Sequence, residues 1–118
     1  SISAMNAVNA EPQTLDIVQM RAAAGQATAT LSALANENRL LLLCQLAKGE
    51  KCVSDLEALL DLHQPTLSQQ LGVLRAEGLV DTRREGKRIY YSVADARVLA
   101  LLSTLYDLYC PQQHCPTP

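Results

Sequence analysis

The sequence predicts a single, mostly α-helical domain that carries one β-hairpin in its second half. Leucines recur at helical spacing along most of the chain, which indicates amphipathic helices. Two runs rich in β-branched and aromatic residues flank Glu85-Gly86-Lys87, a pattern typical of a hairpin. The chain has 118 residues, which suits one domain, and only 3% of them are aromatic, all Tyr, so aliphatic side chains should form the core.

The two ends of the chain lack a folding pattern. Residues 1–14 are small and polar and predict a flexible N-terminal arm, of which residues 1–4, ahead of Met5, are set aside as a candidate cloning remnant. Residues 111–118 are short and proline-rich and predict a C-terminal tail. The folded domain is therefore expected to span residues 15–110.

No apolar run reaches the roughly 18 residues that a membrane span needs, and no signal peptide opens the chain. We therefore expect a cytoplasmic protein without a membrane partner. In that compartment its four cysteines would normally be reduced.

The first half of the domain predicts two helices. Residues 15–35 are alanine-rich with apolar residues in loose helical spacing, which favours a first helix. Asn36 can cap a second helix that runs through residues 39–46 and ends near Lys48-Gly49.

A helix-turn-helix follows. Ser54 can cap a third helix whose Leu56, Leu59 and Leu60 would face inward. Asp61-Leu62-His63 then turns the chain into the next helix, and this succession is typical of a DNA-binding helix pair.

The fourth helix has the features of a recognition helix. Pro65 suits its first turn, Gly78 ends it, and three residues at helical spacing would face the core: Leu67, Leu71 and Leu74. Polar residues gather at its N-terminal end, where they suit base edges and phosphates: Gln64, Thr66, Ser68, Gln69 and Gln70.

The hairpin carries a basic cluster. Residues 79–84 and 88–93 predict two strands, and the tip between and beside them holds Arg83, Arg84, Lys87 and Arg88. Residues 75–88 contain five basic and three acidic residues, whereas the whole chain has a net charge of −2. Such a cluster alone is as well explained by a solvated turn, but directly after a recognition-type helix it favours a clamp on the DNA backbone.

The last helix starts near Asp95 and presents a wide apolar face made of Val98, Leu101, Leu102, Leu105, Leu108 and Tyr109. One small domain cannot easily cover this face. We therefore predict a homodimer in which the first and last helices pair across a two-fold axis. The complete prediction is a winged helix-turn-helix of order α-α-α-α-β-β-α.

Residues 34–93, LANENRLLLLCQLAKGEKCVSDLEALLDLHQPTLSQQLGVLRAEGLVDTRREGKRIYYSV, resemble the ArsR family of winged-helix repressors. Cys44 in RLLLLCQL and Cys110 in LYDLYC resemble the dithiol, BigR/SqrR-like subgroup of that family. The resemblance implies a homodimer on an imperfect palindrome of double-stranded operator DNA. It places bases under the recognition helix (Gln64, Thr66, Ser68, Gln69 and Gln70) and phosphates or the minor groove under the wing (Arg84, Lys87 and Arg88).

The resemblance also suggests which signal the protein senses. Metal-sensing members carry a Cys-Val-Cys box where this chain has Cys52-Val53-Ser54, or ligands on the last helix where this chain has Arg97, Leu108 and Pro111. Neither site has its ligands, so conventional metal sensing is disfavoured and we expect neither a metal nor a cofactor.

In the dithiol subgroup, the helices bearing the two cysteines lie side by side and their sulfurs become linked directly or through bridging sulfurs. The resemblance therefore implies that persulfide, polysulfide or an oxidant crosslinks Cys44 and Cys110 and releases the repressor, which would control genes of sulfide detoxification. Without the resemblance, Cys44 between leucines would be read as a small buried hydrophobe.

Alternatives remain open at this point. Cys110, His114 and Cys115, with Cys44 or Cys52, could offer sulfur ligands to arsenite or a soft metal ion, and Cys115 could compete with Cys110 in disulfide exchange. A helix-turn-helix used only for protein contacts is disfavoured by the basic wing. An enzyme is disfavoured because the chain lacks an acid-base motif, a nucleophile motif and a glycine-rich phosphate loop.

Overall fold

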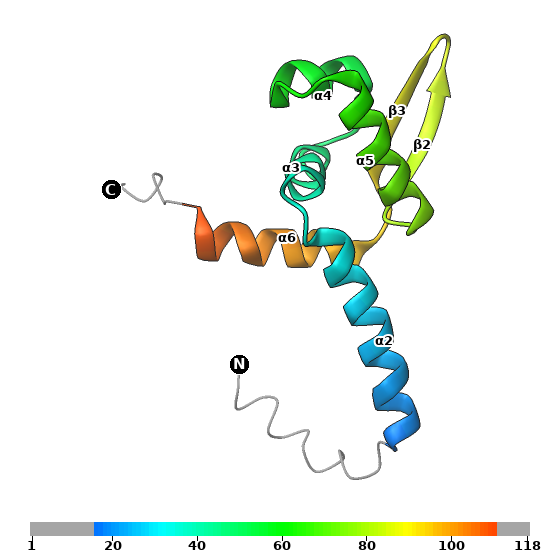
Figure 1. The fold of residues 1–118 in the computed structure, drawn as a ribbon, viewed down its shortest axis with the longest axis vertical. Helices are drawn as coiled ribbons and strands as arrows, with labels where there is room; N and C mark the ends of the chain where they lie inside the picture. The colour runs from blue at the N-terminus through cyan, green and yellow to red at the C-terminus, as the bar shows by residue number, and fades with distance from the viewer. Residues whose placement is uncertain (1–15, 111–118) are drawn as a thin grey trace.

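The computed structural model describes residues 16–110 (Figure 1). The elements follow in the order α2 (Ile17–Leu34), α3 (Glu37–Leu46), β1 (Lys51–Cys52), α4 (Val53–Leu60), α5 (Gln64–Ala76), β2 (Val80–Glu85), β3 (Arg88–Val93) and α6 (Ala96–Tyr109). This order confirms the predicted winged helix-turn-helix and adds one short strand, β1. The predicted arm and tail lie outside the described residues.

Local capping explains where the helices begin. The Asn36 side chain accepts a hydrogen bond from the backbone N–H of Arg39 at 3.0 Å, as the sequence predicted. Asp95 does the same for α6, accepting from the N–H of Arg97 at 2.8 Å. The prediction for α4 was wrong, because its cap is Cys52 rather than Ser54. Residue 52 is the last residue of β1, so its extended backbone leads directly into the first helical turn.

The wing is a three-stranded antiparallel sheet of order β1-β3-β2. β2 and β3 form the predicted hairpin, in which Glu85 pairs with Arg88 around a turn at Gly86 and Lys87. Gly86 has φ 65°, a conformation that strongly favours glycine and suits a two-residue hairpin turn. β1 was not predicted; it pairs Lys51 and Cys52 with Tyr91 and Tyr90 of β3 and joins the wing to the start of α4.

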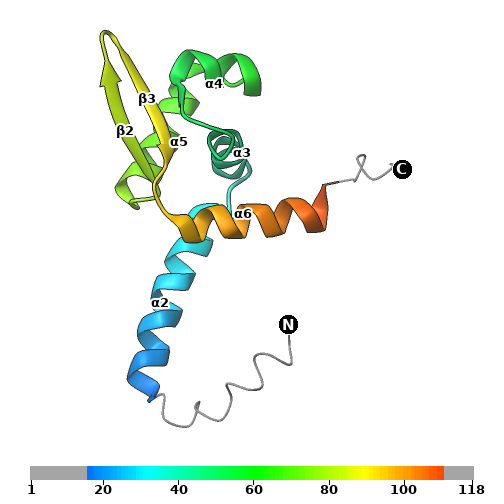
Figure 2. The same ribbon diagram turned by 180° about the vertical axis from the view of Figure 1, so that it is seen from behind.

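The helices α2 and α6 extend away from the helix-turn-helix, as the front and back views show (Figures 1 and 2). In α2 only Ala33 and Leu34 are buried. In α6, Val98 and Leu102 are buried, whereas Leu108 and Tyr109 are 70% and 78% exposed. The predicted wide apolar face therefore exists, and a single chain covers only part of it.

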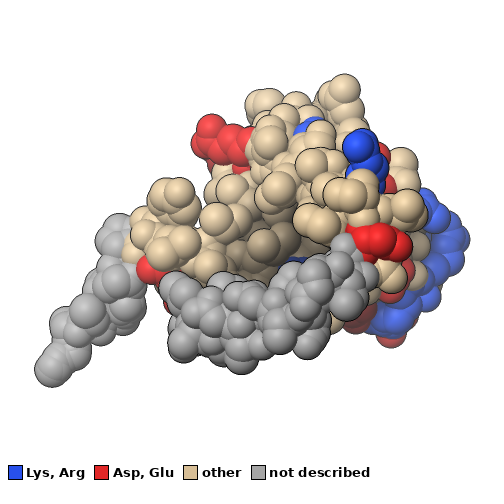
Figure 3. Space-filling model, turned by 90° about the horizontal axis from the view of Figure 1, so that it is seen from below, with Lys and Arg blue, Asp and Glu red and all other residues tan. Residues whose placement is uncertain are grey.

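The lower face of the molecule is mostly uncharged, and Lys and Arg gather mainly at one side of it (Figure 3). No helix among residues 16–110 is long and apolar enough to cross a bilayer.

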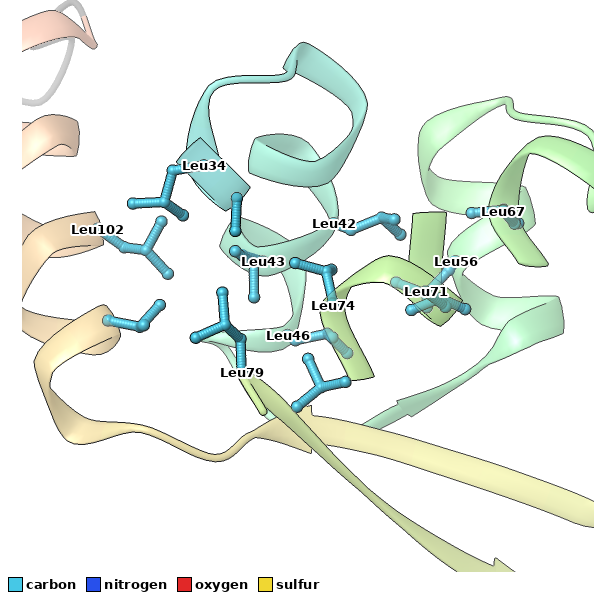
Figure 4. Packing of buried hydrophobic residues seen from close by; sticks show 13 residues of the cluster. Leu34, Leu42, Leu43, Leu46, Leu56, Leu67, Leu71, Leu74, Leu79 and Leu102 are labelled. Atoms are coloured by element: carbon cyan, nitrogen blue, oxygen red, sulfur yellow. The ribbon is translucent and has the colours of Figure 1, made fainter. Parts of the chain in front are cut away.

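The core connects α3 and the recognition helix to α6. Leu34 and Leu102 lie at one end of the cluster and Leu56 and Leu67 at the other (Figure 4). All three predicted core residues of α5 are buried, with at most 1% exposure: Leu67, Leu71 and Leu74. On α4 the prediction is correct for Leu56 and for Leu60, which packs against the cluster, but wrong for Leu59. Leu59 is 54% exposed because this short edge helix buries only one narrow face.

Candidate DNA-binding surface and thiol pocket

The turn before the recognition helix gives α5 its outward position. Asp61 ends α4 in the left-handed conformation, with φ 56°, and its backbone N–H donates to the carbonyl of Glu57 at 2.9 Å. Pro65 lies in the first turn of α5, where its missing N–H breaks no helical hydrogen bond. α5 thus begins abruptly after α4 with its N-terminal turn at the surface.

The predicted DNA-contacting residues of α5 divide into two sets. Gln64, Ser68 and Gln69 are exposed, and Thr66 is half-buried. Gln70 is also half-buried, and its side-chain oxygen accepts a hydrogen bond from Nη1 of Arg39 on α3 at 3.0 Å. Gln70 is therefore already bound within the protein.

The basic residues of the wing, which form one cluster in the sequence, lie in different environments in the structure. Arg83 donates two hydrogen bonds to the carboxylate of Glu50 and one to Glu85 at 2.8 Å, and its guanidinium lies 4.9 Å from the centre of the Tyr90 ring. The hydrogen bonds from Arg83 lower the pKa of Glu50 below its usual range. Two acidic partners thus neutralise Arg83.

The other three basic residues of the wing, Arg84, Lys87 and Arg88, are all exposed. Hydrogen bonding to Tyr90 raises the pKa of Arg88. No ion pair involves Arg84, Lys87 or Arg88 within residues 16–110. The wing therefore keeps Arg84, Lys87 and Arg88 exposed and outside ion pairs, although Arg88 is hydrogen-bonded to Tyr90 and Arg83 is bound to two carboxylates.

Cys44 and Cys110 line the same pocket, although they are 66 positions apart in the sequence. Cys44 lies on α3, and Cys110 directly follows the last residue of α6. The pocket has a volume of about 480 Å³, and its other lining residues come from the same two helices and the turn after α3: Leu41, Gln45, Ala47, Lys48, Leu99, Leu102, Ser103 and Tyr106. Both cysteines are half-buried thiols.

The pocket disfavours ionisation of Cys44. Burial raises the pKa of Cys44, the negative charge of a Cys110 thiolate raises it further, and Lys48 partly offsets both effects. The pocket therefore makes Cys44 a weaker acid than an ordinary cysteine.

Cys52 occupies a different environment. It is 3% exposed, and its sulfur lies 3.2 Å from Oγ of Ser54 and 3.3 Å from Oδ2 of Asp55. It therefore links β1 to α4 and does not line the thiol pocket.

The components of the alternative metal site are not brought together in the described part of the chain. Within residues 16–110 no group of three or more His, Cys, Asp and Glu side chains is arranged to hold a metal ion. His114 and Cys115 lie outside the described residues.

A helix-turn-helix whose recognition helix leads into a basic hairpin defines a winged helix-turn-helix DNA-binding protein. A family model described as "Bacterial regulatory protein, arsR family" matches residues 36–82. The chain is also 55% identical over 80 residues to the biofilm growth-associated repressor of Agrobacterium fabrum (strain C58), a match that covers 68% of each protein. The protein belongs to the ArsR family.

Solved structures give the same assignment. The crystal structure of the transcriptional repressor BigR from Xylella fastidiosa matches with a TM-score of 0.76 and 41% identity, over 83% of this chain and 100% of that one. The homodimeric winged helix-turn-helix domain of Mb0332 from Mycobacterium bovis matches with a TM-score of 0.69 and 33% identity, over 80% of this chain and 87% of that one. Within its family the chain is thus similar to BigR, as the cysteine pattern predicted, and this is a class of regulators rather than enzymes.

Proposed function

We propose that this protein is a homodimeric transcriptional repressor that leaves its operator when Cys44 and Cys110 become crosslinked by persulfide, polysulfide or an oxidant. The observation that carries the proposal is the shared pocket between α3 and α6, which both cysteines line. The similarity to proteins named as repressors supports repression, rather than activation, of the regulated genes.

The proposed dimer uses the surfaces of α2 and α6 that one chain leaves exposed. The two helices enclose a groove of about 520 Å³, and small and apolar side chains form much of its lining: Ala23, Ala27, Leu31, Ala100 and Leu101. The exposed apolar residues on the same helices include Val18 and Tyr106. Burial of this surface against a second copy would be favourable, and the homodimeric state given for the Mb0332 domain supports it.

The proposed DNA contacts follow from exposure. Gln64, Thr66, Ser68 and Gln69 would face base edges in the major groove, and Arg84, Lys87 and Arg88 would contact phosphates or the minor groove. In a two-fold dimer the recognition helices must be about 34 Å apart to enter successive major grooves of an imperfect palindrome.

The proposed sensing chemistry starts at Cys110, because burial raises the pKa of Cys44 and makes its thiol harder to ionise. The Cys110 thiolate attacks the sulfane sulfur of a persulfide RSSH, the S–S bond of the persulfide breaks, and RSH leaves. Cys44, once deprotonated, attacks the sulfur of Cys110 in the new persulfide and expels hydrogen sulfide, which gives a disulfide. Transfer of a further sulfane sulfur before this step gives a longer bridge.

The crosslink would act through α3. This helix packs against α5 and shares the core with α6, so a covalent link from Cys44 to Cys110 would fix α3 relative to α6. A shift of α6 changes the spacing of the two recognition helices and weakens DNA binding. We propose that the regulated genes serve sulfide detoxification and that the protein acts in the cytoplasm, together with the DNA.

The test is peptide-mapped mass spectrometry of the reduced protein after separate treatment with polysulfide, peroxide and arsenite. Binding to a duplex selected from random-sequence DNA by the reduced protein is measured on the same samples. We expect polysulfide to produce a Cys44–Cys110 link together with DNA release. Cys44→Ser should bind the duplex normally and stay bound after treatment, whereas Cys52→Ser, a control outside the pocket, should respond like the unmodified protein.

Release of Cys44→Ser by polysulfide would overturn the proposed mechanism. Release by arsenite, with Cys110 and Cys115 protected and no Cys44–Cys110 link, would instead assign the protein to the arsenite or soft-metal sensors.

A further inference from the structure

Arg39 connects three helices through a single side chain. Its Nε donates to the carbonyl of Ala33 at 2.7 Å and its Nη2 to the carbonyl of Ser32 at 3.3 Å. Both carbonyls belong to the last turn of α2, and the carbonyl of Ser32 also accepts from the backbone N–H of Ala35 at 3.2 Å. Its Nη1 donates to Gln70 on α5 at 3.0 Å.

Arg39 itself is held in place. Its backbone N–H donates to the capping side chain of Asn36 at 3.0 Å, so the residue is fixed at the first turn of α3. The planar guanidinium then offers donors in fixed directions, toward the end of α2 on one side and toward α5 on the other. One rigid group therefore joins the end of α2 to α5, in addition to the shared hydrophobic core.

The contact determines which atoms of Gln70 remain available. A guanidinium only donates hydrogen bonds, so the atom of Gln70 that faces it must be the amide oxygen. A glutamine that reads adenine in the major groove uses both its amide oxygen and its amide nitrogen. In Gln70 the oxygen is bound to Arg39 on α3.

We propose that Gln70 is a positioning residue, which through Arg39 sets the orientation of the recognition helix relative to α2 and does not read a base. The preceding residue, Gln69, is exposed and takes the base-reading role that its sequence neighbour lacks. The proposal needs DNA binding by α5 but does not depend on sensing by Cys44 and Cys110.

The first experiment is a base-pair substitution scan of the selected duplex with Gln70→Met, which removes the acceptor and keeps the side-chain length. We expect operator affinity to fall about a hundredfold, with about tenfold for the hydrogen bond to a charged group that each of the two subunits of the proposed dimer loses, while the preference at each base pair is retained. The matched control, Gln69→Ala, should lose its preference at one base pair. Loss of preference at a single base pair in Gln70→Met would overturn the proposal.

The second experiment is a double-mutant cycle with Arg39→Lys, which keeps the positive charge and removes the planar fork. In the Arg39→Lys background, Gln70→Met should have a smaller effect on operator affinity than in the unmodified protein, because the planar fork that directs the bond to Gln70 is absent. Additive losses would contradict the proposal. Thermal unfolding of each variant separates a change in binding from a loss of folded protein.

Gln70→Glu gives a test that does not require Arg39 to be altered. Glutamate still accepts from Arg39, so the ratio of affinities for the selected and random duplexes should stay within about twofold, although the added charge weakens both. A base-reading residue would instead change its preferred partner from adenine toward cytosine when glutamine becomes glutamate. Such a switch would overturn the proposal.

Discussion

Lys87 and Arg83 are four residues apart on the same hairpin, yet we expect only Lys87 to contribute a phosphate contact. Lys87 lies exposed in the turn, whereas Arg83 is bound to Glu50 and Glu85. Each phosphate contact contributes about 0.9 to the slope of log K against log salt concentration. In the proposed dimer Lys87→Ala removes two contacts, so the slope should fall by about 1.8 and the affinity at 0.1 M salt by about 60-fold.

The control variant for Lys87→Ala removes one positive and one negative charge that are paired with each other in the wing. The double variant Arg83→Gln/Glu50→Gln deletes the wing ion pair and leaves the net charge of the protein unchanged. Fluorescence anisotropy with a random-sequence duplex, measured across a series of salt concentrations, should give the wild-type slope for this variant. An equal loss of slope in the double variant and in Lys87→Ala would refute the assignment of Arg83 to an internal ion pair.

Three further predictions concern base reading, thiol ionisation and the core. Gln69→Ala should relax preference at one base pair of the selected duplex, and an equal loss on specific and random DNA would contradict its role. The rate of Cys44 alkylation, followed by peptide mass spectrometry, should continue to rise above pH 9.0, the ordinary pKa of a cysteine thiol, because burial and Cys110 raise the pKa of Cys44 in the folded protein. A rate that reaches its plateau below pH 9.0 would refute the raised pKa. Leu71→Ala should lower the free energy of unfolding by about 3 to 5 kcal/mol in urea titrations at fixed protein concentration, and a loss below about 1 kcal/mol would show that the site collapses around the smaller side chain.

The fold was predictable where proline and glycine residues mark the ends of elements whose apolar residues also have a clear helical or strand spacing. Pro65, Gly78 and Gly86 mark the start of the recognition helix, its end and the hairpin turn, and the leucines between them have one unambiguous spacing. The prediction that Leu59 faces the core was wrong, because a helix of eight residues has too few turns for its sequence to define the buried face. β1 could not be predicted, since a two-residue strand has no periodicity and depends entirely on its partner β3.

The DNA-binding surface was harder to predict from the sequence, because the hydrogen bonds that hold its side chains join residues far apart in the chain. Arg39 and Gln70 are 31 positions apart, and Arg83 and Glu50 are 33 apart, so residue type alone made Gln70 a candidate base reader and Arg83 part of a uniform basic tip. The pairing of Cys44 with Cys110 could be anticipated only through the family resemblance. The common pocket is consistent with it, and the crosslink itself stays a prediction.

The pairing of β1 with β3 has a mechanical consequence. Strand β3 of the hairpin pairs with β1, which leads into α4, and strand β2 follows α5. The hairpin is therefore attached to both helices of the helix-turn-helix. A hairpin attached only through β2 would be held by α5 alone, whereas pairing with β1 also holds this one to the start of α4. In the proposed dimer, a signal would then need only to change the distance between the two recognition helices, each of which would keep its wing in place.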